Sequence, residues 1–130
     1  MVGKTNKILI VEDSPTMCRL YRMVLGSRQD IELHFAGNGV EGLDRAAQEP
    51  DLDLMIVDIN MPQMDGFEFL RRSRAELGVG APAIVISTEG DEADREAARA
   101  AGATAYLRKP WTPDELLSAI EPLLVAPTDE

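Results

Sequence analysis

Acidic residues follow two of the apolar runs in the sequence. Glu12 and Asp13 come directly after the run at 8–11, and Asp58 comes directly after the run at 54–57. Three carboxylates within about 5 Å of one another would repel by roughly 3 kcal/mol per pair at an effective dielectric of 20, so a cation must offset them. Hard oxygen ligands without His or Cys select Mg²⁺ or Mn²⁺. If the two runs end side by side, these residues are predicted to form a Mg²⁺ site, with Mn²⁺ as the alternative ion.

Two further runs are followed by groups that could act on a ligand of the same ion. Ser87 ends the run at 83–87, and Lys109 follows the run at 104–108. A lysine ammonium supplies a point charge for an incoming anion, and a hydroxyl can hydrogen-bond to it. A single polar residue after a strand commonly does no more than cap the next helix. The prediction therefore depends on the whole set meeting in space.

These side chains can meet only if the runs are strands of one sheet. Five runs are predicted as strands, at 7–11, 31–36, 53–58, 83–87 and 104–108. Helical patterns of about ten residues or more separate them. Ser14-Pro15 and Thr112-Pro113 are helix start signals, and Glu115 adds the capping-box acid to the second. Five such units predict an α/β fold, a (βα)5 parallel sheet covered by helices on both faces.

The patterns of the runs also predict the order of the strands. The runs at 8–11, 54–57 and 83–86 are continuously apolar, as strands buried on both faces must be. The run at 31–35 alternates, and the run at 104–108 is mixed, so both are predicted edges. With right-handed crossovers this favours the doubly wound, flavodoxin-like order 2-1-3-4-5. In such sheets the ligand site lies at the carboxyl ends of the strands, where the polar residues above are placed.

Length and charge limit the classes of function. A chain of 130 residues is about one domain, with a predicted core at about 6–124, an unanchored start at 1–6 and a flexible tail at 125–130. The net charge of −10 argues against direct DNA binding, because the phosphate backbone would be repelled. No apolar run approaches the roughly 18 residues of a membrane span, and no signal peptide is apparent. We therefore expect no membrane association and a cytoplasmic protein.

Four segments resemble the receiver domains of two-component response regulators. They are VEDSPTMCRL, DINMPQMDG, ISTEG and AGATAYLRKPWTPDEL, which begin at residues 11, 58, 86 and 101. The segments occur in the family's order and at its spacing, and the resemblance covers essentially the whole chain. Within the family, the stand-alone chemotaxis regulators are the most similar.

The resemblance implies a role for each residue of the predicted site. Asp58 would be the phosphoacceptor, and Lys109 would pair with the phosphoryl group after a cis bond to Pro110. Further implied roles are the acidic metal-binding pair Glu12 and Asp13, a backbone carbonyl ligand from Asn60, the switch hydroxyl of Ser87 and the switch aromatic ring of Tyr106.

The implied function is a phosphorylation-activated switch. Asp58 would take a phosphoryl group from the phosphohistidine of a histidine kinase or phosphotransfer protein, with Mg²⁺ bound. An output protein would then bind the face formed by the helix at 91–102, the strand at 104–108 and the helix from 113. That first helix has alanines at 93, 97, 100 and 101 on its predicted inward stripe, so it should be weakly held. Asn60 and Glu89 would flank the water that removes the phosphoryl group, and Glu89 would orient that water or tether Lys109.

Three alternative functions compete with this one. A phosphorylation-independent interaction module is the most serious, although Asp13, Asp58 and Lys109 argue against it. An aspartate-nucleophile phosphatase of the haloacid-dehalogenase type needs a second acid two residues after the first, where Asn60 stands. A flavin binder would need a Ser, Thr or Gly-rich loop after the first strand, where acidic residues would repel the phosphate. Beyond its own phosphorylation and dephosphorylation, no enzymatic activity is expected.

Overall fold

The computed structural model describes residues 5–61 and 64–124, which form alternating strands and helices. The strands are β1 (Asn6–Val11), β2 (Ile31–Ala36), β3 (Leu54–Asp58), β4 (Ala83–Ser87) and β5 (Ala105–Arg108). The helices are α1 (Pro15–Leu25), α2 (Gly39–Gln48), α3 (Gly66–Leu77), α4 (Glu92–Ala101) and α5 (Pro113–Ile120), followed by the short 3-10 helix η1 (Glu121–Leu123). The strands lie within one residue of their predicted bounds.

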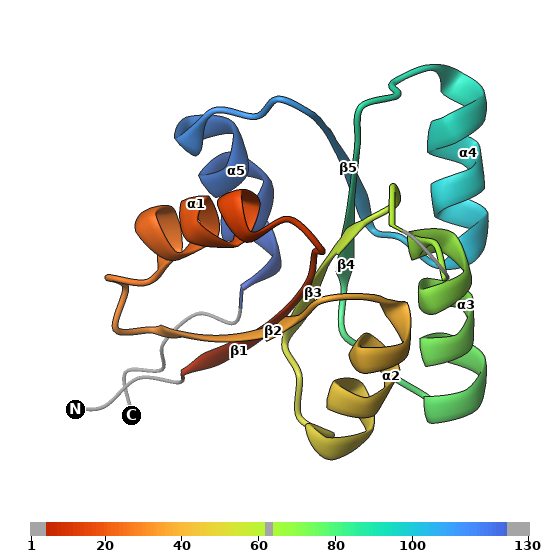
Figure 1. Cartoon of the computed structure of the whole chain (residues 1–130), viewed down its shortest axis with the longest axis horizontal. Helices are drawn as coiled ribbons and strands as arrows, with labels where there is room; N and C mark the ends of the chain where they lie inside the picture. The colour runs from red at the N-terminus through yellow and green to blue at the C-terminus, as the bar shows by residue number, and fades with distance from the viewer. Residues whose placement is uncertain (1–4, 62–63, 125–130) are drawn as a thin grey trace.

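The strands form one parallel sheet with the order β2-β1-β3-β4-β5 (Figure 1). This confirms the predicted fold class and strand order. The edge position of β2 agrees with its alternating pattern, since Glu32 is exposed between buried Ile31 and half-buried Leu33. β3 and β4 are buried along their whole lengths.

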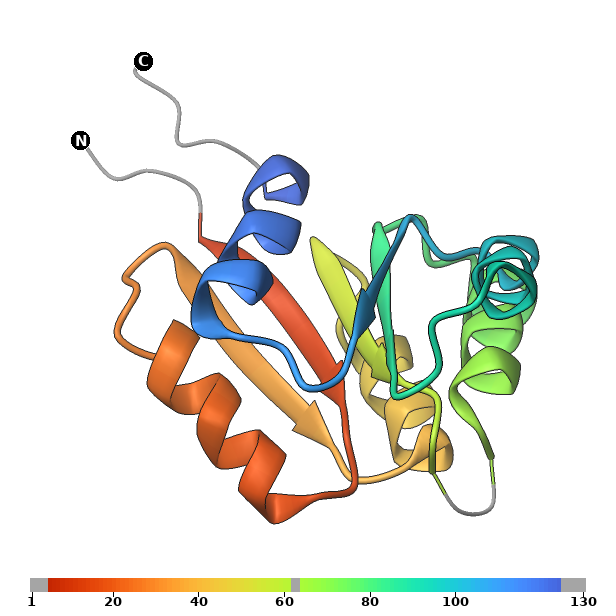
Figure 2. The ribbon, with the colours of Figure 1, turned by 90° about the horizontal axis from the view of Figure 1, so that it is seen from above.

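Helices cover both faces of the sheet. α1 and α5 lie on one face, and α2, α3 and α4 lie on the other (Figures 1 and 2). Alternate residues of β1 pack on opposite faces of the sheet. Ile8 and Ile10 pack with α1 and α5, whereas Leu9 and Val11 pack on the other face. The sheet therefore needs apolar residues at consecutive positions, which is why its central strands read as continuous apolar runs.

Side-chain caps begin the helices where the sequence predicts them. The Ser14 hydroxyl accepts a hydrogen bond from the Met17 amide at 3.3 Å, with Pro15 at the first helical position. Thr112 and Glu115 form a complete capping box at the start of α5. These caps accept hydrogen bonds from amide groups that have no acceptor within the helix. They therefore define where each helix begins after the site edge of the sheet.

The inward face of α4 differs from the predicted one. Ala98 and Ala101 are buried, but the alanines at 93, 97 and 100 are not, so the predicted stripe was wrong at these three positions. An alanine-rich helix carries small apolar side chains on several faces, and its sequence pattern cannot define which one packs inward. The expectation that α4 buries little apolar surface still holds, since its two buried side chains are both alanine.

The predicted chain ends need one correction. Asn6 is fully buried as the first residue of β1, and its amide donates to the Asp30 carbonyl at 2.8 Å, so it is not part of an unanchored start. The predicted tail at 125–130 lies outside the described residues. Within the part of the chain that the structure describes, no helix is long and apolar enough to cross a membrane.

Candidate functional site

Four strands deliver the predicted site residues to one edge of the sheet. Glu12 and Asp13 follow β1, Asp58 ends β3, Ser87 ends β4 and Lys109 follows β5. One carboxylate oxygen from each of Glu12, Asp13 and Asp58 lies within 4.8 Å of the other two. Because β1, β3, β4 and β5 are consecutive neighbours and parallel, their carboxyl ends meet at the same edge.

Asp58 is buried at the end of β3. Its side chain is 2% exposed, and its Oδ1 accepts from the Lys109 ammonium at 3.0 Å. The Asn60 amide donates to the same oxygen at 3.2 Å. The Lys109–Pro110 peptide bond is cis, as the resemblance implies. A buried carboxylate must be paired to remain charged, and Lys109 supplies that pairing.

A glycine allows the chain to turn tightly below Asp58. Gly66 begins α3, and a Cβ atom built there would lie 2.5 Å from the Asp58 carbonyl oxygen. Its amide donates to the Ile59 carbonyl at 3.3 Å, so the start of α3 is fastened to the residue after the phosphoacceptor candidate. Any larger residue would push α3 away from β3, which ties the MDG part of the sequence to the position of Asp58.

Glu12 shows most clearly that the acidic cluster could hold a cation. It is 2% exposed, and its Oε2 accepts from the Ser14 amide at 3.1 Å. Its other oxygen, Oε1, has no hydrogen-bond partner among the described residues. Burial and the nearby Asp58 charge raise the pKa of Glu12 to about 7. An orphaned, buried carboxylate oxygen beside two further carboxylates fits a hard divalent cation, since it is costly without one.

Ser87 and Tyr106 are connected through the backbone of one residue. The Glu89 amide donates to the Ser87 hydroxyl at 3.1 Å. The Tyr106 hydroxyl donates to the Glu89 carbonyl at 2.6 Å. Ser87 is buried at the end of β4, whereas the Tyr106 ring is half-buried beside α4. Two hydrogen bonds thus join the site edge to the surface between α4 and β5.

Asn60 and Glu89 lie at the rim of the site. Both residues are exposed. Lys109 forms its salt bridge with Asp58, and within residues 5–61 and 64–124 no salt bridge joins it to Glu89. The sequence-based suggestion that Glu89 tethers Lys109 therefore has no support, while its placement beside Ser87 is as expected.

An aromatic pair lies under the site. The ring centroid of Trp111, which precedes α5, lies 5.1 Å from that of Tyr21. Tyr21, on α1, is 1% exposed, and burial together with the charges of Glu12 and Asp58 raises its pKa. The sequence pattern places Tyr21 on the apolar stripe of α1 with Met17 and Leu25, which indicates that its side chain is buried. The pattern does not show that Tyr21 lies near the acidic residues.

Comparisons with known proteins agree with this geometry. Residues 8–121 match the family model described as the response regulator receiver domain. The chain is 36% identical over 119 residues to the chemotaxis protein CheY homolog of Campylobacter jejuni, covering 91% of this chain and 92% of that protein. It is 32% identical to the transcriptional regulatory protein SrrA of Staphylococcus aureus, covering 92% of this chain and 48% of SrrA. The crystallised chemotaxis protein CheY4 of Vibrio cholerae superimposes with a TM-score of 0.85 at 32% identity, covering 92% and 99% of the two chains.

Proposed function

This chain belongs to the response regulator receiver domain family of two-component signalling, and on that premise we propose that Asp58 accepts a phosphoryl group from a phosphohistidine. The donor is a histidine kinase or a phosphotransfer protein. The observation that carries the proposal is the buried Asp58, paired with Lys109 and grouped with Glu12 and Asp13 at the carboxyl edge of the sheet.

The transfer needs a nucleophile and neutralisation of charge. An Asp58 carboxylate oxygen attacks phosphorus, the bond from phosphorus to the donor imidazole breaks, and its electron pair leaves with the ring. Glu12, Asp13, Asp58 and the Asn60 backbone carbonyl would hold Mg²⁺, which would supply positive charge against the phosphoryl oxygens. Lys109, already 3.0 Å from Asp58, is placed to follow the new negative charge. The role of the protein is thus mainly positioning and electrostatics.

The hydrogen bonds around Glu89 support a route from the phosphoryl group to the surface. When the Ser87 hydroxyl turns to a phosphoryl oxygen, the Glu89 amide loses its present acceptor. The Glu89 carbonyl, which accepts from Tyr106, then moves with the same peptide segment. Tyr106 lies against the weakly packed α4, so its reorientation alters the face formed by α4, β5 and α5. We infer that this face controls an output protein.

The same site indicates whether the protein acts as a signalling protein or as an enzyme. The chain catalyses its own phosphorylation and dephosphorylation and acts on its partner by binding, so we propose a signalling protein of the cytoplasm and not an enzyme. Its net charge of −10 favours a protein over DNA as the direct partner.

Phosphorylation by a small donor tests the proposal without knowledge of the kinase. The protein is incubated with acetyl phosphate and Mg²⁺, and its intact mass is measured. We expect the mass of one added phosphoryl group, lost in Asp58→Asn and in the presence of a chelator, and retained in the control Asp44→Asn, which removes a carboxylate of α2. If the wild type gains no mass, the phosphorylation-independent interaction module replaces this proposal; steady release of phosphate from several phosphate esters would instead indicate a phosphatase.

A further inference from the structure

A groove lies between α1 and the outer edge of the sheet. It contains a pocket of about 470 Å³, lined by Arg22 of α1, by Gly26 just after that helix, and by Ile31, Leu33 and Phe35 of β2. We refer to this site as the β2 groove. It lies at the edge of the sheet opposite β5, away from the face formed by α4, β5 and α5 (Figure 1).

Half of the backbone groups of β2 point away from β1. The Glu12 amide donates to the Ala36 carbonyl at 2.9 Å, so the even-numbered residues of β2 direct their backbone groups toward β1. In a strand, the amide and carbonyl of one residue point to the same side, and the side alternates along the chain. The backbone groups of Leu33 and Phe35 therefore point outward. Within the part of the chain that the structure describes, no hydrogen bond reaches them.

The groove side of β2 lacks the features that usually protect an edge strand. Edges in native proteins are commonly short, or carry prolines or charged side chains that prevent further pairing. The opposite edge, β5, has four residues and ends at Arg108, whereas β2 has six residues and no proline. The Glu32 carboxylate lies 2.6 Å from the His34 ring, and Arg45 of α2 donates to that ring at 2.9 Å. The polar residues of β2 thus lie on the α2 side, and the groove side is open to a further strand.

Arg22 supplies the charge of the β2 groove. Its guanidinium lies over the Phe35 ring, 4.3 Å from the ring centroid. Among the described residues, this guanidinium forms no salt bridge and no hydrogen bond. α1 carries Arg19 and Arg22 but no acidic residue. A guanidinium that stacks on a ring keeps its N–H donors at its rim, where they match the two oxygens of a carboxylate.

We propose that the β2 groove binds an extended segment of a partner protein, which joins the sheet as a further strand beside β2. The segment pairs its backbone with the outward groups of Leu33 and Phe35. Its side chains on one face are apolar and fill the pocket, except for one carboxylate that pairs with Arg22. The stated chemistry of the partner segment is therefore apolar and acidic residues on the same face of a strand.

A second copy of this chain fits the groove less well than such a segment. The acidic residue of β2, Glu32, lies on the α2 side, so two paired β2 strands would bring no carboxylate to Arg22. Each copy also carries a net charge of −10, and the two would repel each other. The segment binds without phosphorylation of Asp58, because the groove shares no residue with the acidic site. It also leaves the face formed by α4, β5 and α5 accessible to an output protein.

Synthetic peptides test both the strand pairing and the charge. The probe is a short rhodamine-labelled peptide in which valine and glutamate alternate with serine, and a matched peptide has glutamine in place of glutamate. Two further peptides carry N-methyl groups on alternate amides, either those of the serines or those of the other residues. Binding is measured by fluorescence anisotropy and by amide chemical shifts of the protein. The groove variant is Arg22→Gln, and the control is Arg71→Gln, which removes the same charge from an exposed position on α3. Melting temperatures verify that both variants fold.

We expect the glutamate peptide to bind wild type and Arg71→Gln alike, and Arg22→Gln about fivefold more weakly. The glutamine peptide should bind the three proteins equally. A strand offers only alternate amides to β2, so one N-methylated peptide should lose binding and the other should retain it. Amide shifts should change at Leu33 and Phe35.

The proposal is overturned if the glutamate peptide does not bind wild type, or binds Arg22→Gln and Arg71→Gln equally. It is also overturned if the two N-methylated peptides behave alike, because the bound segment is then not a strand. A wild-type dimer that the glutamate peptide dissociates would overturn it in favour of a second copy.

Discussion

The acidic residues of the site oppose one another in the absence of a metal ion. Lys109 offsets the charge of Asp58, but Glu12 is buried with an oxygen that has no partner among the described residues, and Asp13 adds a third carboxylate within 4.8 Å. Such an arrangement stores repulsion that a divalent cation or a change of charge can release. This repulsion lowers the stability of the metal-free protein.

Asp58→Asn is expected to raise the stability of the metal-free protein. The change removes the repulsion between Asp58 and the carboxylates of Glu12 and Asp13. These two carboxylates remain in the site and balance the charge of Lys109. We expect a higher melting temperature in chelator, with a gain on the order of 1 kcal/mol. The variant should also show a smaller rise in melting temperature on addition of Mg²⁺. A melting temperature no higher than that of wild type would contradict this electrostatic picture, and Asp44→Asn serves as the control for removal of a distant charge.

The size of residue 60 is expected to control the lifetime of the phosphoryl group. Asn60 is exposed two residues after Asp58, at the rim where water approaches phosphorus. Asn60→Arg would place a long side chain across this approach and should slow loss of the phosphoryl group, by about tenfold, without preventing its transfer. The decay is followed by intact mass after removal of acetyl phosphate. Asn60→Ser, which adds no bulk, is the control; an unchanged decay rate in Asn60→Arg would show that solvent access is set elsewhere.

At the level of elements, α4 is held by smaller side chains than α5. Its two buried side chains are alanines, whereas α5 buries Leu116 and Ile120. Arg74 of α3 donates to the Gly102 carbonyl at the carboxyl end of α4 at 2.9 Å, and to the carbonyls of Val79 and Ala81, in the loop between α3 and β4, at 2.7 and 2.5 Å. α4 is therefore anchored at the end far from Ser87 and is held mainly by small contacts near the site. That distribution allows its amino end to respond to the switch residues.

Arg74→Met is expected to loosen the loop between α3 and β4 together with the carboxyl end of α4. The change keeps an apolar stem but removes hydrogen bonds to three carbonyls, which should lower the free energy of unfolding by about 2–4 kcal/mol. Amide hydrogen exchange should increase most in this loop and at the carboxyl end of α4. Arg72→Met is the matched control on the same helix, because its salt bridges with Glu68 and Glu76 are exposed and should contribute less than about 1 kcal/mol. Similar losses in the two variants would show that Arg74 is not the anchor.

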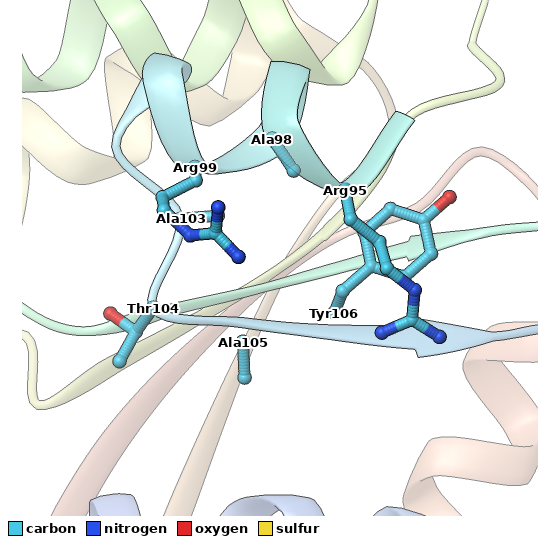
Figure 3. Close-up of a pocket in the computed structure, with 7 residues that line it drawn as sticks. All are labelled: Arg95, Ala98, Arg99, Ala103, Thr104, Ala105 and Tyr106. Atoms are coloured by element: carbon cyan, nitrogen blue, oxygen red, sulfur yellow. The ribbon is translucent and has the colours of Figure 1, made fainter. Parts of the chain in front are cut away.

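At the scale of the whole molecule, negative charge is unevenly distributed. The chain carries a net charge of −10, and its buried acidic residues lie at the carboxyl edge of the sheet. Two arginines, Arg95 and Arg99, lie on the neighbouring face between α4 and β5 (Figure 3). The hydrogen bonds through Glu89 join the acidic edge to this face.

The metal-free protein is expected to lose stability as the pH rises through neutrality. Burial and the Asp58 charge raise the pKa of Glu12 from its ordinary value of 4.5 to about 7, so the folded state favours the protonated form. Its contribution is fully present below pH 4.5 and is lost as the pH rises through about 7. In chelator, Glu12→Gln should flatten this part of the stability curve measured by urea unfolding between about pH 5 and 8. A Glu12→Gln curve parallel to that of wild type would assign the dependence to other groups.

The sequence alone determined the fold and the composition of the site. Continuous apolar runs predicted buried parallel strands, the alternation at 31–35 predicted the β2 edge, and the caps at Ser14 and Thr112 predicted two helix starts. Parallel strands put their carboxyl ends together, so the polar residues that follow them could be grouped by their positions in the chain. Local pattern sufficed because each of these features depends on the period of a strand or on one helix end.

Only the tertiary structure decided how these parts are connected. The inward face of α4 had to be read from its packing, because alanines lie on several of its faces. The partnerless oxygen of Glu12, the anchor provided by Arg74 and the link from Ser87 through Glu89 to Tyr106 each depend on residues of different elements. Such contacts are set by distances between segments far apart in the chain, which neither periodicity nor spacing contains.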